Sequence, residues 1–308
     1  MNTPVLLIAW RRPCHLIKVI DAVRKVEPKN VFVAVDGPRI GDNYSEERQL
    51  IIKTKEVIER EIDWDCKLML NYQEKNLGCR LGVSSAISWF FSNVDEGIIL
   101  EDDCVPSLDF FKFSVEMLNK YRDNYQIMHI TGNNFNRGHN FNRDSYYFSD
   151  YNHAWGWATW KRAWEHYHYS LEYWLEIKNK RFLEKYLKSR IQLKFWTKYY
   201  EEIFVTKELD TWDYVWRLNI WFNNGLTISP NVNLVANIGF DDLATHTQNG
   251  LPTPIEVLNF PLKHPQKIVR NRQTDLWTFQ KQIAERYVIK HSLRFRIIRR
   301  VKKYLKLK

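Results

Sequence analysis

The sequence predicts an α/β protein with a mainly parallel central sheet flanked by helices. From the N-terminus onward, short apolar runs of strand type alternate with helical segments of about 10–15 residues, which indicates right-handed βαβ crossovers. A polar segment follows each strand, at the edge where open α/β sheets bind their ligands. The chain of 308 residues is long enough for one large domain or about two ordinary ones.

The expected elements follow one another along the chain. Apolar runs predict strands over residues 5–9, 31–35, 67–70, 97–100 and 127–130. The segments between them predict helices over 14–26, 46–61, 80–91 and 108–121. Residues 170–205 are expected to be helical, with one apolar stripe formed by Leu183, Leu187, Ile191 and Phe195. A helix beginning near Asp210 ends at Asn223-Asn224-Gly225, and strands are expected over 226–228 and 232–235.

The composition is that of a soluble globular protein, with 44% hydrophobic and 27% charged residues. No run approaches the ~20 apolar residues of a membrane span, and the N-terminus lacks a signal-peptide pattern. The cysteines are scattered without a CxxC pair, at Cys14, Cys66, Cys79 and Cys104. This favours a reducing compartment and argues against a zinc site, so we expect a cytoplasmic protein.

The net charge of +10 is concentrated at the C-terminus. No acid follows Glu285, whereas ten of the 46 basic residues do, so residues 1–285 hold 36 bases against 36 acids. A neutral body argues against a nucleic-acid groove. Leu293, Ile297 and Val301 place an apolar stripe within the basic segment, which is typical of an interfacial helix on anionic lipid. We expect residues 271–308 to form a basic amphipathic tail that holds the protein at the inner face of the cytoplasmic membrane.

An acidic triplet, Glu101-Asp102-Asp103, ends the strand over 97–100 and precedes a helix. Clustered carboxylates repel one another unless a cation joins them, and Mg²⁺ or Mn²⁺ takes carboxylate oxygens while leaving positions open for phosphate. This predicts a metal–diphosphate site. The alternative is an acidic turn on a solvated surface, with the acids favoured by the dipole of the following helix.

Other strand ends narrow the class of enzyme. The first strand ends in Trp10-Arg11-Arg12-Pro13, where a dinucleotide-binding dehydrogenase would carry GxGxxG, and the chain has no GxxxxGK[ST] of a Walker-type ATPase. Asp36 ends the second strand, either as a ligand-binding residue or as the stabiliser of its own turn. Arg80 lies where the positive end of a helix would favour phosphate, although solvated surface charge is the simpler account.

Together these segments resemble a glycosyltransferase of the GT-A fold. The segments are the first apolar run, Val35-Asp36-Gly37, Asn76-Leu77-Gly78, and Leu100-Glu101-Asp102-Asp103 with Leu108-Asp109-Phe110-Phe111 behind it. Within that fold the chain is most similar to the N-acetylglucosaminyltransferase I family and to family-2-like bacterial sugar transferases, over roughly residues 4–250.

The resemblance implies roles for the strand-end residues. Asp103 would hold Mn²⁺ against the diphosphate of the donor, Glu101 and Asp102 would contact ribose and metal-bound water, and Asp36 would bind uracil. This chain has Trp-Arg-Arg where those enzymes have Cys-Asp-Arg, so the resemblance does not decide which arginine contacts the nucleotide. We take Arg11 and Arg80 as the arginines expected to contact the nucleotide donor.

The middle of the chain is rich in aromatic residues, with nine of the thirteen tryptophans between Tyr146 and Phe222. Aromatic faces suit the C–H faces of pyranose rings, and a glycine lets backbone approach a ligand closely. Trp155, Gly156 and Trp157 are therefore candidates for sugar binding, whereas most of the other rings are expected to fill a core. Similar Trp-Gly-Trp turns line the sugar site of related GT-A enzymes.

An inverting transfer needs a base on the acceptor side. The inverting relatives place an Asp in a similar Trp-Asp segment, which implies Asp213 as that base, with Asp210 as an N-cap residue; a purely structural role for both acids is the alternative. Many GT-A enzymes complete the metal shell with a late histidine, which makes His246 a candidate ligand.

The sequence therefore predicts an inverting, metal-dependent glycosyltransferase. Residues 1–135 would bind the nucleotide-sugar donor, a UDP-sugar such as UDP-GlcNAc, and residues 136–270 a glycan acceptor of lipopolysaccharide or capsule type, with Mn²⁺ or Mg²⁺ as cofactor and no nucleic acid as partner. A non-catalytic carbohydrate-binding or membrane-active protein is the rival from another class. A sugar-phosphate nucleotidyltransferase would usually carry a glycine-rich signature near its first strand, and none is present.

Overall fold

A computed structural model describes residues 1–41, 44–136, 138–139, 143–240 and 254–284. Its first half alternates strands and helices as the sequence predicts: β1 (Val5–Ala9), α1 (Pro13–Arg24), β2 (Asn30–Val35), α2 (Ser45–Glu61), β3 (Lys67–Tyr72), α3 (Gly78–Phe91), β4 (Glu96–Glu101), β5 (Cys104–Pro106), α4 (Leu108–Tyr121) and β6 (Ile127–Thr131). The second half contains β7 (Tyr146–Ser149), β8 (Trp157–Trp160), α5 (Lys161–Trp164), α6 (Leu171–Asn179), α7 (Phe182–Tyr186), α8 (Arg190–Phe204), α9 (Asp213–Phe222), β9 (Leu226–Pro230), β10 (Val235–Asn237), α10 (Arg272–Thr278) and a π-helical turn over Phe279–Ala284.

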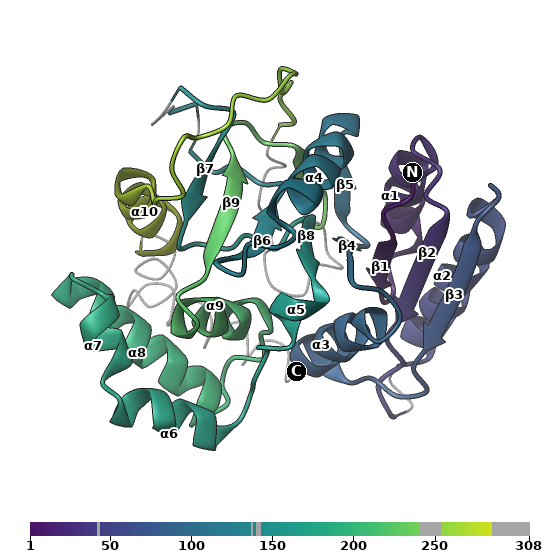
Figure 1. Cartoon of the computed structure of the whole chain (residues 1–308). Helices are drawn as coiled ribbons and strands as arrows, with labels where there is room; N and C mark the ends of the chain where they lie inside the picture. Colours follow the sequence, from purple (N-terminus) through teal and green to yellow (C-terminus); the bar gives the residue numbers. More distant parts are fainter. Residues whose placement is uncertain (42–43, 137, 140–142, 241–253, 285–308) are drawn as a thin grey trace.

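Within the described residues one sheet of eight strands crosses the molecule in the order β3-β2-β1-β4-β8-β6-β9-β7 (Figure 1). Strands β1 to β4 are mutually parallel, and β6 pairs in parallel with β9. Strands β8 and β7 run antiparallel to their neighbours, so the second half of the sheet is mixed. The α/β class with a flanked central sheet is as predicted.

Both faces of the sheet are covered by helices, which explains why its strands are continuously apolar. Val5 and Leu7 of β1 face one side, where they pack with apolar residues of α1, α2 and α4. Leu6 of β1 and Phe32 of β2 face the other side, where α3 and α9 cover them. A third cluster joins α6, α7, α8 and α9, which lie together away from β1 to β3 (Figure 1).

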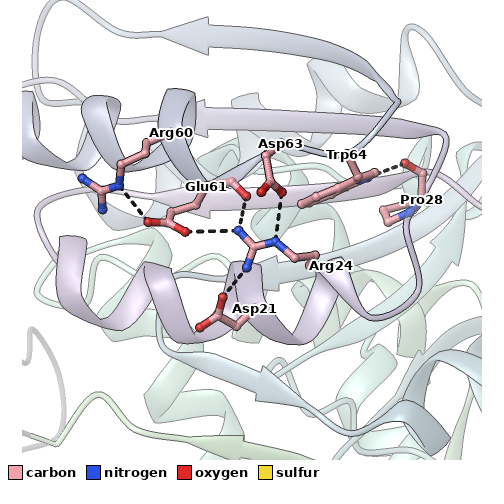
Figure 2. Close-up of polar contacts among 7 residues, drawn as sticks. All are labelled: Asp21, Arg24, Pro28, Arg60, Glu61, Asp63 and Trp64. Carbon is pink, nitrogen blue, oxygen red and sulfur yellow. Dashed lines mark hydrogen bonds and ion pairs between the residues drawn. The ribbon is translucent and has the colours of Figure 1, made fainter.

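An ionic network fastens the outer helices of the first half. Arg24 at the end of α1 contacts Asp63 at 3.0 Å and the Glu61 carboxylate at 3.1 Å, and it pairs with Asp21 one turn earlier (Figure 2). Trp64 donates from its indole nitrogen to the carbonyl oxygen of Pro28 at 3.1 Å. These contacts connect the loop after α2 to the loop after α1. They lie at the amino ends of β2 and β3, away from the carboxyl ends of the strands.

Several sequence predictions need correction. The stripe of Leu183, Leu187, Ile191 and Phe195 does not form, because α7 ends before Leu187 and a new helix begins at Arg190, which leaves Ile191 73% exposed. The strand expected over 232–235 begins at Val235 instead and pairs antiparallel with β5. Strands β7 and β8 were not predicted, although their aromatic residues favour extended structure.

Residues 271–284 belong to the body rather than to a separate tail. Asp275 of α10 is fully buried and accepts hydrogen bonds from the Ser149 hydroxyl and the Asp150 backbone N–H. Arg270 pairs with both Asp150 and Asp275. The basic tail therefore starts later than residue 271, and residues 285–308 lie outside the described residues. None of the described helices is both long and apolar enough to span a membrane.

Arg270→Gln should lower the free energy of unfolding by about 3–5 kcal/mol, because Asp150 and Asp275 would stay buried without their cation. Burial raises the pKa of both carboxyl groups in the folded protein. A carboxyl group whose pKa is higher in the folded protein than in the unfolded chain destabilises the fold as the pH rises through that pKa. Urea denaturation should therefore show a larger drop in the free energy of unfolding for Arg270→Gln at about pH 8 than at about pH 5.5. Arg181→Gln, at an exposed pair with Glu184, is the matched control and should change little. An equal response of the two variants would contradict this account of α10.

Candidate functional site

The strand order places a crevice beside β1. The chain winds from β1 to β2 and β3 on one side and then returns to β4 on the other, so β1 and β4 flank a topological switch point. Ligands of open α/β sheets bind beyond the carboxyl ends of strands at such points. A cavity of about 270 Å³ lies there, bounded by the ends of β1, β2 and β4 and by the first turns of α3.

Asp36 organises one wall of this cavity. Its carboxylate accepts hydrogen bonds from the backbone N–H groups of Gly37 at 2.8 Å and Leu77 at 2.9 Å, and from the Asn76 side chain at 2.9 Å. Burial raises the pKa of Asp36, although the N–H groups of Leu77 and Gly37 act in the opposite direction. Asp36 therefore stabilises its own turn, as the structural alternative predicted, and also joins the end of β2 to the start of α3.

Two acids of the triplet, Glu101 and Asp102, line the cavity. Asp102 accepts a hydrogen bond from the backbone N–H of Trp10 at 3.1 Å and lies 3.3 Å from Nε of Arg12. Burial, followed by the negative charges of Asp103 and Asp102, raises the pKa of Glu101 to about 8. The triplet is a largely buried group of carboxylates, and not an acidic turn in free solvent.

Asp103 has a different environment and is not part of the cavity wall. Its Oδ2 pairs with Nη1 of Arg12, and its Oδ1 lies 3.3 Å from the Asn237 amide and 3.4 Å from the Cys104 thiol. The side chain is only 7% exposed. The residue that the resemblance implies as the metal ligand is thus held by donors of the chain itself.

The structure changes the roles expected for the arginines. Arg12 and Arg39, rather than Arg11 and Arg80, line the cavity. Arg11 lies over the Trp10 ring at 4.4 Å and contacts Glu47 at 3.5 Å. Trp10 and Arg39 were missed because a sequence does not tell which side chains after a strand turn inward; their place directly after β1 and β2 was the only signal.

Arg80 connects α3 with the segment that precedes α9. Its guanidinium lies 3.6 Å from the Tyr169 ring centroid and 3.6 Å from Asp210. Helix α9 begins at Asp213 with Trp212 as its N-cap, so Asp210 is not the cap residue that the sequence suggested. Asp210 instead pairs with Arg80 and touches the start of α3 at Gly78.

Asp213 opens α9 as a first-turn acid, as predicted. Its carboxylate accepts a hydrogen bond from the Thr211 hydroxyl, and its backbone carbonyl accepts one from Asn152 at 3.1 Å. Its negative charge contributes to the raised pKa of Glu101 and of Cys79, both of which line the cavity. Asp213 therefore lies near Glu101 and Cys79, although it is not itself part of the cavity wall.

The sugar-binding prediction for Trp157 is wrong in this structure. The ring is fully buried and stacked between His129, at 4.6 Å, and Trp212, at 5.4 Å. Gly156 has a φ of +71°, and a Cβ there would come within 2.8 Å of Val235, so its close backbone approach is to the protein core and not to a ligand. Trp155 is half-buried against Phe135 and Phe240, and its contact with a sugar stays a prediction.

The described residues do not form a ready site for a divalent cation. Among them no three His, Cys, Asp or Glu side chains converge as metal ligands. The oxygens of Asp102 and Asp103 already accept from Trp10, Arg12 and Asn237. His246 lies outside the described residues.

No protein-family model matches the sequence, and no curated protein sequence matches it. Among solved structures the chain is similar to S. aureus TarS 1-349, with 10% identity and a TM-score of 0.43, over 76% of this chain and 59% of that one. It is similar to the 4-diphosphocytidyl-2C-methyl-D-erythritol synthase of Anaerococcus prevotii, with 11% identity and a TM-score of 0.35, over 72% of this chain and 97% of that one. It is also similar to HddC from Yersinia pseudotuberculosis, with 10% identity and a TM-score of 0.32, over 52% and 77%. The evidence for a function therefore comes from the cavity and the residues that line it.

Trp157→Ala should lower the free energy of unfolding by about 3–5 kcal/mol, because it empties a fully enclosed space between two rings. Trp155→Ala is the matched comparison and should lower it less, because that ring keeps part of its surface in solvent. Urea denaturation of both variants measures the difference. Equal stability of the wild type and Trp157→Ala would return Trp157 to the list of ligand-binding candidates.

Proposed function

We propose that the protein is an inverting glycosyltransferase that moves a sugar from a nucleoside diphosphate donor, a UDP-sugar, to a cell-surface glycan such as lipopolysaccharide or capsule. The observation that carries this proposal is the cavity at the β1–β4 switch point, which brings together a carboxylate beside a helix start, an arginine and paired acids. A nucleotide needs a polar recess for its base and positive charge for its phosphates, and this cavity offers both.

The donor would lie with its base near Asp36 and its phosphates toward Arg12. Asn76 and Gln73 also line the cavity near Asp36 and carry amide groups that match the donor and acceptor pattern of a pyrimidine edge. Arginine presents a planar set of N–H donors that fits phosphate oxygens. Trp10 offers an aromatic face in the same wall.

The transfer step would use Asp213 as the base. The acceptor hydroxyl loses its proton to the Asp213 carboxylate while its oxygen bonds to the anomeric carbon of the donor sugar. The bond from that carbon to the diphosphate oxygen breaks, and the nucleoside diphosphate leaves with the electron pair. Attack from the face opposite the leaving group inverts the anomeric configuration. The place of Asp213 near Glu101, an acid of the cavity wall, supports this assignment.

Asp213→Asn should reduce turnover by about 10²–10⁴-fold and leave nucleotide affinity nearly unchanged, because it removes the proton acceptor and no donor contact. Asp210→Asn is the matched control: it changes an acid three residues away that pairs with Arg80 and should keep turnover. Transfer from a panel of nucleotide sugars to isolated glycans, with the product anomer read by NMR, measures both effects. Full turnover of Asp213→Asn, or a retained anomeric configuration, would contradict the mechanism.

A non-catalytic carbohydrate-binding protein is distinguished by the same assay components. Calorimetry should detect binding of UDP by the wild type, with an affinity that falls when Asp36 is replaced by alanine. Glycan binding without any nucleotide binding would favour the carbohydrate-binding alternative.

The basic C-terminal sequence supports a place at the inner face of the cytoplasmic membrane, as a proposal from its composition alone. Deleting residues 286–308 should abolish co-sedimentation with anionic vesicles, since each base near such a surface contributes about 1 kcal/mol. Neutral vesicles are the control for charge, and nucleotide binding by the shortened protein is the control for folding. Undiminished binding of the shortened protein to anionic vesicles would show that the tail is not the anchor.

A further inference from the structure

We infer that Arg12 takes the place that a divalent cation would hold beside Asp102 and Asp103, so that the protein binds its nucleoside diphosphate without a metal ion. This inference rests on the proposed function, because it concerns the same cavity and the same donor. It departs from the metal dependence that the acidic triplet suggested in the sequence.

The carboxylate oxygens of Asp102 and Asp103 already have partners within the chain. Oδ1 of Asp102 lies 3.3 Å from Nε of Arg12, and Oδ2 accepts from the Trp10 backbone N–H at 3.1 Å. Oδ2 of Asp103 pairs with Nη1 of Arg12, and Oδ1 lies 3.3 Å from the Asn237 amide. Three of the four oxygens therefore accept a hydrogen bond from the chain, and the fourth, Oδ1 of Asp102, lies at ion-pair distance from Arg12. A metal ion would have to break several of these contacts in order to bind.

Arg12 and its two acidic partners are also enclosed by the protein. Arg12 is 8% exposed, Asp102 4% and Asp103 7%. A guanidinium displaced from two carboxylates at this depth would be a buried charge without its partners, which is strongly unfavourable. Gly239 also lies against the Arg12–Asp103 pair, and a Cβ at that position would collide with both side chains. The backbone after β10 thus occupies the space over the pair.

The guanidinium of Arg12 is oriented by both acids. Nε lies 3.3 Å from Asp102, and Nη1 pairs with Asp103. Arg12 also forms part of the cavity wall, whereas Asp103 does not. One edge of the guanidinium is fixed by the acids, and the side chain still reaches the cavity. Such an arrangement suits a phosphate, because arginine keeps its charge at all physiological pH values and binds oxyanions through two N–H groups.

The charge balance agrees with this arrangement. One guanidinium does not cancel two carboxylates, and the remaining negative charge is offset by the Trp10 N–H and the Asn237 amide. Arg39 also lines the cavity wall, where its guanidinium pairs with Glu47. In this account Asp102 and Asp103 are positioning residues that hold Arg12, and they do not contact the donor phosphates through a metal.

The wild-type protein provides the decisive test. Calorimetric titration with UDP, GDP and CDP, in excess EDTA and again in Mn²⁺, should give affinities for the preferred nucleotide that differ by less than about threefold. An affinity that rises tenfold or more with Mn²⁺ would overturn the inference while leaving the proposed function intact. Failure of all three nucleotides to bind under either condition would overturn both.

Arg12→Gln should weaken binding of the same nucleotide by about 10–100-fold in EDTA, the loss expected for a charged hydrogen bond to phosphate. Arg12→Gln leaves two buried carboxylates without a cation, so Arg12→Gln with Asp103→Asn is measured beside it. The double variant removes one positive and one negative charge, which keeps the local net charge of the wild type, and it should fold and still bind weakly. Arg24→Gln is the matched control, since Arg24 also bridges acids but lies on the remote surface of α1 (Figure 2). Wild-type affinity in the folded double variant would overturn the inference.

Discussion

The contacts of Arg12 with Asp102 and Asp103 join the ends of β1 and β4, and the candidate site depends on them. Parallel strands share no hairpin, so the register of β1 and β4 at their carboxyl ends has to be held by side chains once the ladder stops at Ile8 and Glu101. Arg12 and the Trp10 N–H provide that link. The same contacts reduce the electrostatic repulsion among the three carboxylates of the triplet. One guanidinium therefore joins the two strand ends and also lies in the wall of the cavity.

Much of the fold follows from local pattern. The strands β1, β2 and β4 are apolar at every position that the two-sided burial requires, and Ser107 caps α4 by accepting a hydrogen bond from the Phe110 N–H at 3.2 Å. These features depend on neighbours in the sequence, so they can be predicted. The antiparallel insertion of β8 between β4 and β6 depends on which distant strand fills a vacant edge, and no local pattern encodes it.

Some residues of the candidate site could likewise be predicted from the local sequence, and others could not. Asp36, Glu101 and Asp102 were predictable as residues of the cavity wall because they stand at the carboxyl ends of parallel strands, and that edge faces the cavity. Trp157 was misjudged because a tryptophan beside a glycine suits a sugar face and a packed core equally well; only the rings of His129 and Trp212 on either side decide. Asp103 differs from its neighbour in the turn after β4, because Asp102 lines the cavity whereas the carboxylate of Asp103 lies against Arg12 and Asn237. Its role as a metal ligand stays a prediction.

The two sides of the cavity are also connected through α3. Asp36 holds the start of this helix from the end of β2, through the Leu77 N–H and the Asn76 amide. From the other side Asp210 reaches Gly78 and pairs with Arg80, three residues before the acid that opens α9. Both contacts converge on the first turn of α3, so this turn joins the cavity wall to the segment that leads into α9.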